Sequence, residues 1–123
     1  MLARVNTSAR SEASVARLPT RLGIAVPLKA ADERGFPLAG EMRELATIEE
    51  RLGAAIRESG GRLVLVITTG GMREFISYVP SRSVGDAAAA RVRSSTATHS
   101  IQHYTETDED WGVLNAFTKP GRP

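Results

Sequence analysis

Residues 63–79 read Leu63-Val64-Leu65-Val66-Ile67-Thr68-Thr69-Gly70-Gly71-Met72-Arg73-Glu74-Phe75-Ile76-Ser77-Tyr78-Val79, and this stretch decides the fold. Two apolar segments of strand-like composition flank the Gly-Gly pair. Glycine adopts positive φ without steric cost, so a two-residue Gly-Gly connection predicts a tight β-hairpin. The turn then pairs Thr69 with Met72, and the pairing continues outward along both strands.

This register determines which side chains share a face of the sheet. We expect Leu65 opposite Ile76 and Val66 opposite Phe75. Strict alternation places two sets of side chains on opposite faces. One face presents Val64, Val66, Phe75 and Val79, and the other presents Leu63, Leu65, Ile67 and Ile76. Both faces are largely apolar, so the hairpin needs a cover on each side.

The segments around the hairpin predict short strands and two main helices. Residues 2–6, 22–28 and 101–104 are expected to be strands, and residues 8–19 a loop or short helix. A helix is expected between Gly40 and Gly60, because apolar residues recur there at three- and four-residue spacing: Met42, Leu45, Ile48, Leu52, Ala55 and Ile56. Residues 87–92 predict a second helix, with Ser83 and Asp86 as a capping box. Residues 111–117 predict a terminal turn or short helix.

The order of these elements predicts an α+β fold. The central β-α-β-β-α-β portion is typical of a ferredoxin-like sandwich with an antiparallel sheet, here with an additional N-terminal strand. We expect a single domain of residues 1–123 with a flexible end at residues 118–123. Two helices cover only one face of such a sheet. We therefore expect a homodimer or a partner protein on the second face, the alternative being a monomer whose N-terminal strand and tail suffice.

Composition excludes several classes of function. The chain has 123 residues, with 16 Lys and Arg against 14 Asp and Glu, and this small excess does not favour nucleic-acid binding. No apolar run approaches the length of a membrane-spanning helix. The chain contains no cysteine, which excludes disulfides, cysteine metal sites and thiol nucleophiles. That absence is consistent with a cytoplasmic protein.

Three segments carry a resemblance to a known family. They are Arg-Leu-Gly-Ile-Ala-Val-Pro-Leu at 21–28, Ile-Thr-Thr-Gly-Gly-Met-Arg-Glu-Phe at 67–75 and Tyr-Thr-Glu-Thr-Asp-Glu-Asp-Trp at 104–111. Together they resemble the bacterial domain-of-unknown-function family 695, from about residue 2 to residue 117. Members usually carry residues before the position of Met1, so an upstream strand is expected to be missing or replaced.

The resemblance also implies a type of partner. Domains of that family sometimes accompany a domain resembling regulator of ribonuclease E activity B, which has a ferredoxin-like fold and binds a ribonuclease. The resemblance therefore supports the fold and suggests protein binding. It supplies no catalytic residues.

The sequence offers candidate binding residues but no reaction. Gly70-Gly71 precedes a strand and no lysine follows it, unlike a phosphate-binding loop. His99 and His103 are four residues apart without a third ligand, so no metal site is assigned. Asp110 is a candidate N-cap for the turn at Trp111, and Trp111 is read as an anchor more readily than as a ligand platform. The candidate binding residues are Thr68, Thr69, Arg73, Glu74, Tyr78, His103, Tyr104 and Trp111.

These observations favour a small non-catalytic binding or regulatory domain that acts through protein contacts. The alternative is a small-ligand-binding domain or an enzyme, with a cleft near the turn at 68–74 and the loop at 104–111. No catalytic, cofactor-binding or metal-binding residue is assigned under either hypothesis.

Overall fold

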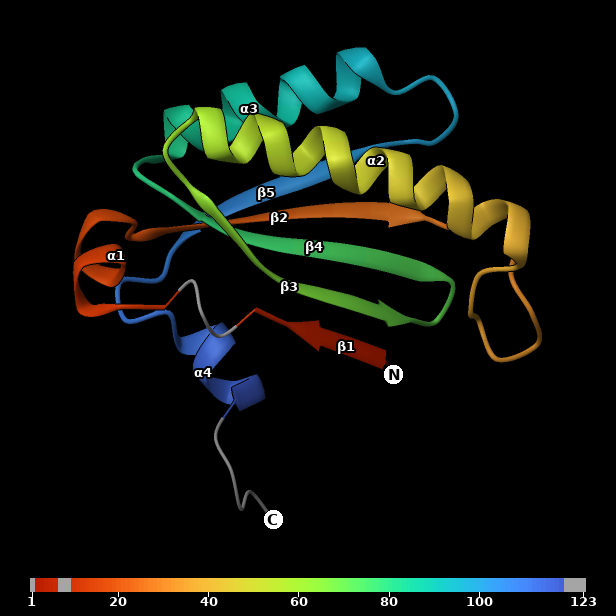
Figure 1. Cartoon of the computed structure of the whole chain (residues 1–123), viewed down its shortest axis with the longest axis horizontal. Helices are drawn as coiled ribbons and strands as arrows, with labels where there is room; N and C mark the ends of the chain where they lie inside the picture. Colours follow the sequence, from red (N-terminus) through yellow and green to blue (C-terminus); the bar gives the residue numbers. More distant parts are fainter. Residues whose placement is uncertain (1, 7–9, 119–123) are drawn as a thin grey trace.

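The computed structural model describes residues 2–6 and 10–118. Its elements follow the chain in the order β1 (Leu2–Val5), α1 (Glu12–Arg17), β2 (Thr20–Pro27), α2 (Ala39–Glu58), β3 (Arg62–Thr69), β4 (Met72–Val79), α3 (Arg82–Ser95), β5 (Gln102–Thr107) and α4 (Gly112–Thr118) (Figure 1). The expected flexible end lies outside the described residues, apart from Thr118 at the end of α4. None of the helices in the described ranges is long and apolar enough to cross a membrane.

The strands form one sheet in the order β1-β3-β4-β2-β5, with every neighbouring pair antiparallel. Strands β2 to β5 with helices α2 and α3 reproduce the β-α-β-β-α-β pattern of a ferredoxin-like sandwich. The predicted α+β class and antiparallel sheet are confirmed. Strand β1 is the additional strand, and it extends the sheet beyond β3 at one edge (Figure 1).

The hairpin has the predicted register near its turn. Leu65 lies opposite Ile76 and Val66 opposite Phe75, and the pairing closes at Thr69 and Met72. The two turn glycines both have positive φ, 57° at Gly70 and 77° at Gly71. This is the backbone conformation that favours glycine, so the inference from the Gly-Gly pair is confirmed.

A β-bulge changes the far end of the hairpin. The register shifts between Leu63 and Leu65, so Val64 is an extra residue in β3. Val64 packs with Leu65 on the second face, whereas Leu63 packs against the core under the helices. The predicted faces of Leu63 and Val64 are therefore wrong. A bulge adds one residue to a strand, and the run of five apolar residues at 63–67 does not indicate which of them is the extra one.

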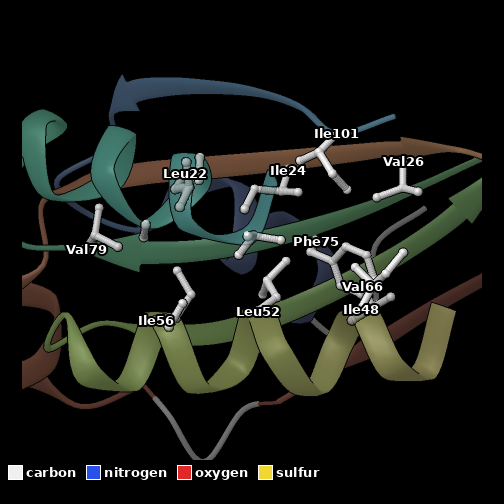
Figure 2. Packing of buried hydrophobic residues seen from close by; sticks show 14 of the residues in the cluster. Leu22, Ile24, Val26, Ile48, Leu52, Ile56, Val66, Phe75, Val79 and Ile101 are labelled. Carbon is white, nitrogen blue, oxygen red and sulfur yellow. The ribbon is translucent and has the colours of Figure 1, made fainter. Parts of the chain in front are cut away.

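Helices α2 and α3 cover one face of the sheet (Figure 1). The predicted stripe of α2 is confirmed for Leu45, Ile48 and Leu52, which are fully buried, but Met42 is 52 % exposed. Figure 2 shows the side chains of α2 interdigitating with those of the central strands in a core that includes Leu22, Ile24, Val26, Ile56, Val66, Phe75 and Val79. Close packing of this kind makes each buried side chain sensitive to truncation.

The protein covers much of the second face with its own α1 and α4. Leu18, Trp111 and Leu114 are fully buried there, together with Val64, Leu65, Ile76 and Tyr78 of the hairpin. In Figure 1, α4 lies on the opposite side of the sheet from α2 and α3. The expectation of a partner on this face rested on an uncovered apolar surface, and α1 and α4 remove that reason for it.

Two local expectations near α3 and β5 are wrong. Helix α3 begins at Arg82 and its N-cap is Ser81, whose Oγ accepts the backbone N–H of Val84 at 3.3 Å. Ser83 therefore lies inside the first turn and is not the cap. The last strand runs to Thr107, past the predicted end at Tyr104, because pairing with β2 continues as far as Thr20.

Leu52→Ala is expected to lower the free energy of unfolding by about 2–5 kcal/mol, because it leaves a cavity in the core under α2. Met42→Ala, on the same helix but largely exposed, is expected to change it by less than about 0.5 kcal/mol. Urea denaturation of both variants measures the difference. Equal losses would mean that α2 does not pack as described.

Candidate functional site

The structure distributes the eight predicted binding residues over several places. Thr68 and Arg73 face the helix side of the sheet, where they touch each other. Four others lie on the second face, namely Glu74, Tyr78, Tyr104 and Trp111. His103 contacts α3, and Thr69 is exposed beside the turn. They do not line one cleft between the 68–74 turn and the 104–111 loop.

Asp108 organises the second face. Its carboxylate accepts hydrogen bonds from the Tyr78 hydroxyl at 2.7 Å and from Arg21 Nη1 at 2.9 Å. It also accepts the backbone N–H groups of Gly112 and Val113, so Asp108 caps α4 and the expected cap at Asp110 is wrong. Burial raises the pKa of Asp108, but these hydrogen bonds outweigh it and the pKa is lowered. Asp108 is therefore a charged anchor for α4.

Tyr78 and Trp111 complete this anchor. Their rings stack with centroids 4.4 Å apart, and Trp111 Nε1 donates to the carbonyl of Leu18 at 2.8 Å. Burial is the main cause that raises the pKa of Tyr78, and the Asp108 hydrogen bond adds to it. The phenol thus stays protonated. With Trp111 fully buried, the geometry supports its interpretation as an anchor.

The Tyr104 ring lies over Gly23 on the second face of the sheet. A Cβ at Gly23 would fall 2.1 Å from the Tyr104 ring, so the ring occupies the space that a side chain would fill. Its hydroxyl donates to Glu74 at 2.7 Å, and burial followed by this bond raises the pKa of Tyr104 to about 12. The Arg21 guanidinium lies 5.8 Å from the ring centroid. These contacts bind β5 to β2 and β4.

A large hollow lies between α2 and the strands β1, β3 and β4. This arginine cleft has a volume of about 780 Å³, and its walls are Arg4, Met42, Ala46, Thr47, Glu49, Glu50, Gly53, Arg57, Leu63 and Arg73. Three of these lining residues are arginine and two are glutamate. Arg4 on β1 pairs with Glu49 on α2, which closes the cleft partly from the edge of the sheet.

Arg73 places a half-buried positive charge in the wall of the cleft. Its Nε donates to Thr68 Oγ1 at 2.9 Å, and no ion pair joins Arg73 or Arg57 to another residue in the described ranges. Burial lowers the pKa of Arg73, the carboxylate of Glu49 raises it and the charge of Arg4 lowers it again, for a net lowering. The guanidinium is still charged at neutral pH, because an unperturbed arginine titrates above about 12. Within the described ranges it is a half-buried cation that forms no direct ion pair.

The arginine cleft continues along the edge of the sheet. A second hollow of about 320 Å³ shares Arg4, Glu49 and Leu63 with it and extends over β3 to Asn6 and Val64. Gly53 lies under the Arg57 guanidinium, whose Nη1 is 3.3 Å from the position of a Cβ at Gly53. A larger residue there would push Arg57 outward. Together the two hollows form a groove with a positive centre.

A buried polar cluster at the start of α2 was not predicted. His99 Nε2 lies 2.6 Å from Glu41 Oε1, and both side chains are essentially inaccessible. Glu41 Oε2 accepts the backbone N–H groups of Lys29 and Ala30. Burial raises the pKa of Glu41, but the backbone bonds and His99 outweigh it, so the pKa is lowered. The sequence analysis considered His99 together with His103 because they are four residues apart. In the structure, His103 contacts Asp86 and Arg93 on α3.

Comparison with known proteins gives a family but no activity. The sequence model of a family of unknown function, DUF695, matches residues 1–117. No curated protein matches the chain. The expected association with domains resembling regulator of ribonuclease E activity B stays a prediction.

Glu41→Gln is expected to lower the free energy of unfolding at neutral pH by about 1–3 kcal/mol, because charge-assisted bonds to the Lys29 and Ala30 amides are weakened. The pKa of Glu41 is lowered in the folded state, so its contribution is complete above the ordinary carboxylate range and is lost as the pH falls through the folded value. The difference from the native protein should therefore shrink on acidification.

Urea denaturation at about pH 7, 5 and 3 tests this pH dependence. Glu50→Gln, on the exposed side of the same helix, serves as the control and should change stability little at any pH. A Glu41→Gln deficit that persists undiminished at the lowest pH would contradict the assignment.

Proposed function

The chain belongs to the DUF695 family of unknown function, and we propose that it is a non-catalytic binding module whose arginine cleft takes up an acidic segment of a partner protein. The observation that carries this proposal is the Arg73 guanidinium, half-buried in the wall of the cleft without a carboxylate partner in the described ranges. A bound carboxylate would offset the cost of burying that charge.

The geometry of Arg73 suits a carboxylate. The hydrogen bond from Nε to Thr68 Oγ1 holds the plane of the guanidinium, and Thr68 is itself buried. The two terminal nitrogens remain as donors for a ligand. Arginine binds carboxylates through two parallel hydrogen bonds when its plane is held in this way.

The length of the cleft favours a chain segment over a compact molecule. Met42 and Arg57 line the cleft from opposite ends of its helical wall. They are 15 residues apart in α2, which corresponds to about 22 Å at 1.5 Å per residue. An extended peptide of about six or seven residues covers that distance.

The walls also match a segment that mixes acidic and apolar residues. Met42, Ala46 and Leu63 line the cleft alongside the arginines. Met42 is among the exposed large hydrophobic side chains, because it begins the apolar stripe of α2 before the part that packs on the sheet. Methionine adapts to differently shaped partners, so it suits a binding surface.

Arg73→Met is expected to weaken binding of a fluorescein-labelled heptapeptide of alternating Glu and Leu by about 10- to 150-fold. The change removes a charged hydrogen-bond donor worth about 1.5–3 kcal/mol while keeping the unbranched stem of the side chain. Fluorescence anisotropy measures the affinity, and thermal denaturation checks that the variant is folded.

Arg82→Met is the matched control, because it removes the same charge at an exposed position on α3. It should weaken binding by no more than about twofold, as expected for a distant exposed charge. Equal losses in the two variants would mean that the peptide responds only to net charge. Equal binding of a Lys-Leu heptapeptide would also contradict the proposal.

A further inference from the structure

The buried cluster at the start of α2 has the donor set of a metal site. Glu41, Glu44 and His99 each offer a ligand atom, and these atoms lie within 4.8 Å of one another. Two of the side chains, Glu41 and His99, are almost completely buried. We infer that His99 Nδ1 and Glu44 Oε1 hold a Zn²⁺ ion, with Glu41 positioning the imidazole ring. This site is separate from the arginine cleft and does not depend on the function proposed for it.

The hydrogen bonds of Glu41 determine which nitrogen of His99 faces the ion. Glu41 receives backbone N–H groups on Oε2, so its carboxylate acts as an acceptor. The 2.6 Å contact with Oε1 then places the imidazole proton on Nε2. Nδ1 keeps its lone pair, which accepts a hydrogen bond from the Thr98 hydroxyl at 2.9 Å and must release that bond to an ion. A carboxylate that holds one nitrogen of a histidine while the other binds metal is a common arrangement at zinc sites.

The distances around Nδ1 fit an ion after a small adjustment. Nδ1 lies 3.9 Å from Glu44 Oε1 and 2.9 Å from Thr98 Oγ1. Two ligands of a tetrahedral zinc ion at about 2.0–2.1 Å are separated by about 3.4 Å. Glu44 is half-exposed at the helix surface, so its carboxylate can move about half an ångström closer to Nδ1 without disturbing the core. The ion displaces the hydrogen bond from the Thr98 hydroxyl to Nδ1, and water completes the coordination.

One of the two proposed ligands, Glu44 Oε1, already pairs with a cation. The Lys29 ammonium lies 2.9 Å from Glu44 Oε1, and its side chain is about half exposed. The ammonium marks a place where positive charge is stabilised, and its flexible stem lets it leave. Lys29 is therefore a competitor for the ion. Imidazole nitrogen combined with carboxylate oxygen suits Zn²⁺ better than Mg²⁺ or Ca²⁺, which prefer oxygen ligands alone.

Zinc at this position would tie the α3–β5 connection to α2. His99 and Thr98 lie in that connection, between Ser95 and Gln102, while Glu41 and Glu44 lie in the first turns of α2. Binding to the folded state alone raises stability according to the ratio of free ion to Kd. The melting temperature should therefore rise with zinc concentration.

Isothermal titration of the untagged full chain with ZnCl₂ tests the inference, together with thermal denaturation. We expect one saturable equivalent and a rise in Tm. Lys29→Ala should bind more tightly by at least about threefold, because the competing ammonium is gone. Glu44→Gln should bind about tenfold more weakly or worse. His99→Gln should abolish binding.

Controls separate this site from other zinc ligands. His103→Gln removes the second histidine and should leave the affinity unchanged, and so should the exposed Glu50→Gln. Because His99→Gln removes a buried contact and could unfold the protein, the surface variants Lys29→Ala and Glu44→Gln decide the question. No saturable binding, or affinities unaltered in both of these variants, would overturn the inference.

Discussion

The β3–β4 hairpin is apolar on both faces, and the rest of the structure follows from the need to cover both. Val66, Phe75 and Val79 face α2 and α3, whereas Leu65, Ile76 and Tyr78 face the other way. A ferredoxin-like arrangement supplies helices on one side only. The second cover comes from the two ends of the chain, which bring α1 and α4 onto the same face. The stacked Tyr78 and Trp111 rings and the Asp108 carboxylate hold that cover in place.

The arginine cleft is a consequence of adding a strand to this fold. Helices α2 and α3 pack over the strands of the ferredoxin-like core, and β1 extends the sheet past β3 without a third helix above it (Figure 1). The exposed side of α2 and the widened sheet therefore enclose a groove. Arg4 from β1 and Arg73 from β4 reach into it, and the Arg4–Glu49 ion pair connects the added strand to α2. The feature that departs from the common fold thus creates the candidate binding surface.

Local patterns in the sequence were sufficient for the hairpin, the main helix stripe and the fold class. The turn requires positive φ at Gly70 and Gly71, and glycine is the residue type that adopts positive φ most readily. The contact between Thr68 and Arg73 also followed from the register. The bulge at Val64 could not be predicted from the sequence, because one extra apolar residue within an apolar run does not change the pattern of the run. The cap at Asp108 was misplaced by two residues, since several acids stand together there.

The candidate sites depended on contacts that no local pattern encodes. Glu41 and His99 are 58 residues apart and meet only after α2 and the α3–β5 connection have packed. The groove depends on where β1 pairs, and Leu2–Val5 contains no residue that identifies its neighbour. Met42 carried a usable signal, because it begins the apolar stripe at a position that the sheet does not reach. The alternative of a cleft near residues 68–74 and 104–111 stays a prediction, although its candidate residues lie on both faces of the sheet and Tyr104 contacts Glu74 on one of them.

The most direct measurement of the proposed binding function is an NMR titration of the ¹⁵N-labelled protein with the Glu-Leu heptapeptide, following backbone amides and arginine Nε–Hε resonances together. A peptide bound in the arginine cleft should produce saturable shifts of the Arg73 Nε–Hε signal and of amides in β1, β3 and the side of α2 that carries Met42 and Arg57. Shifts spread evenly over the surface arginines, or confined to α4 and the second face, would contradict it.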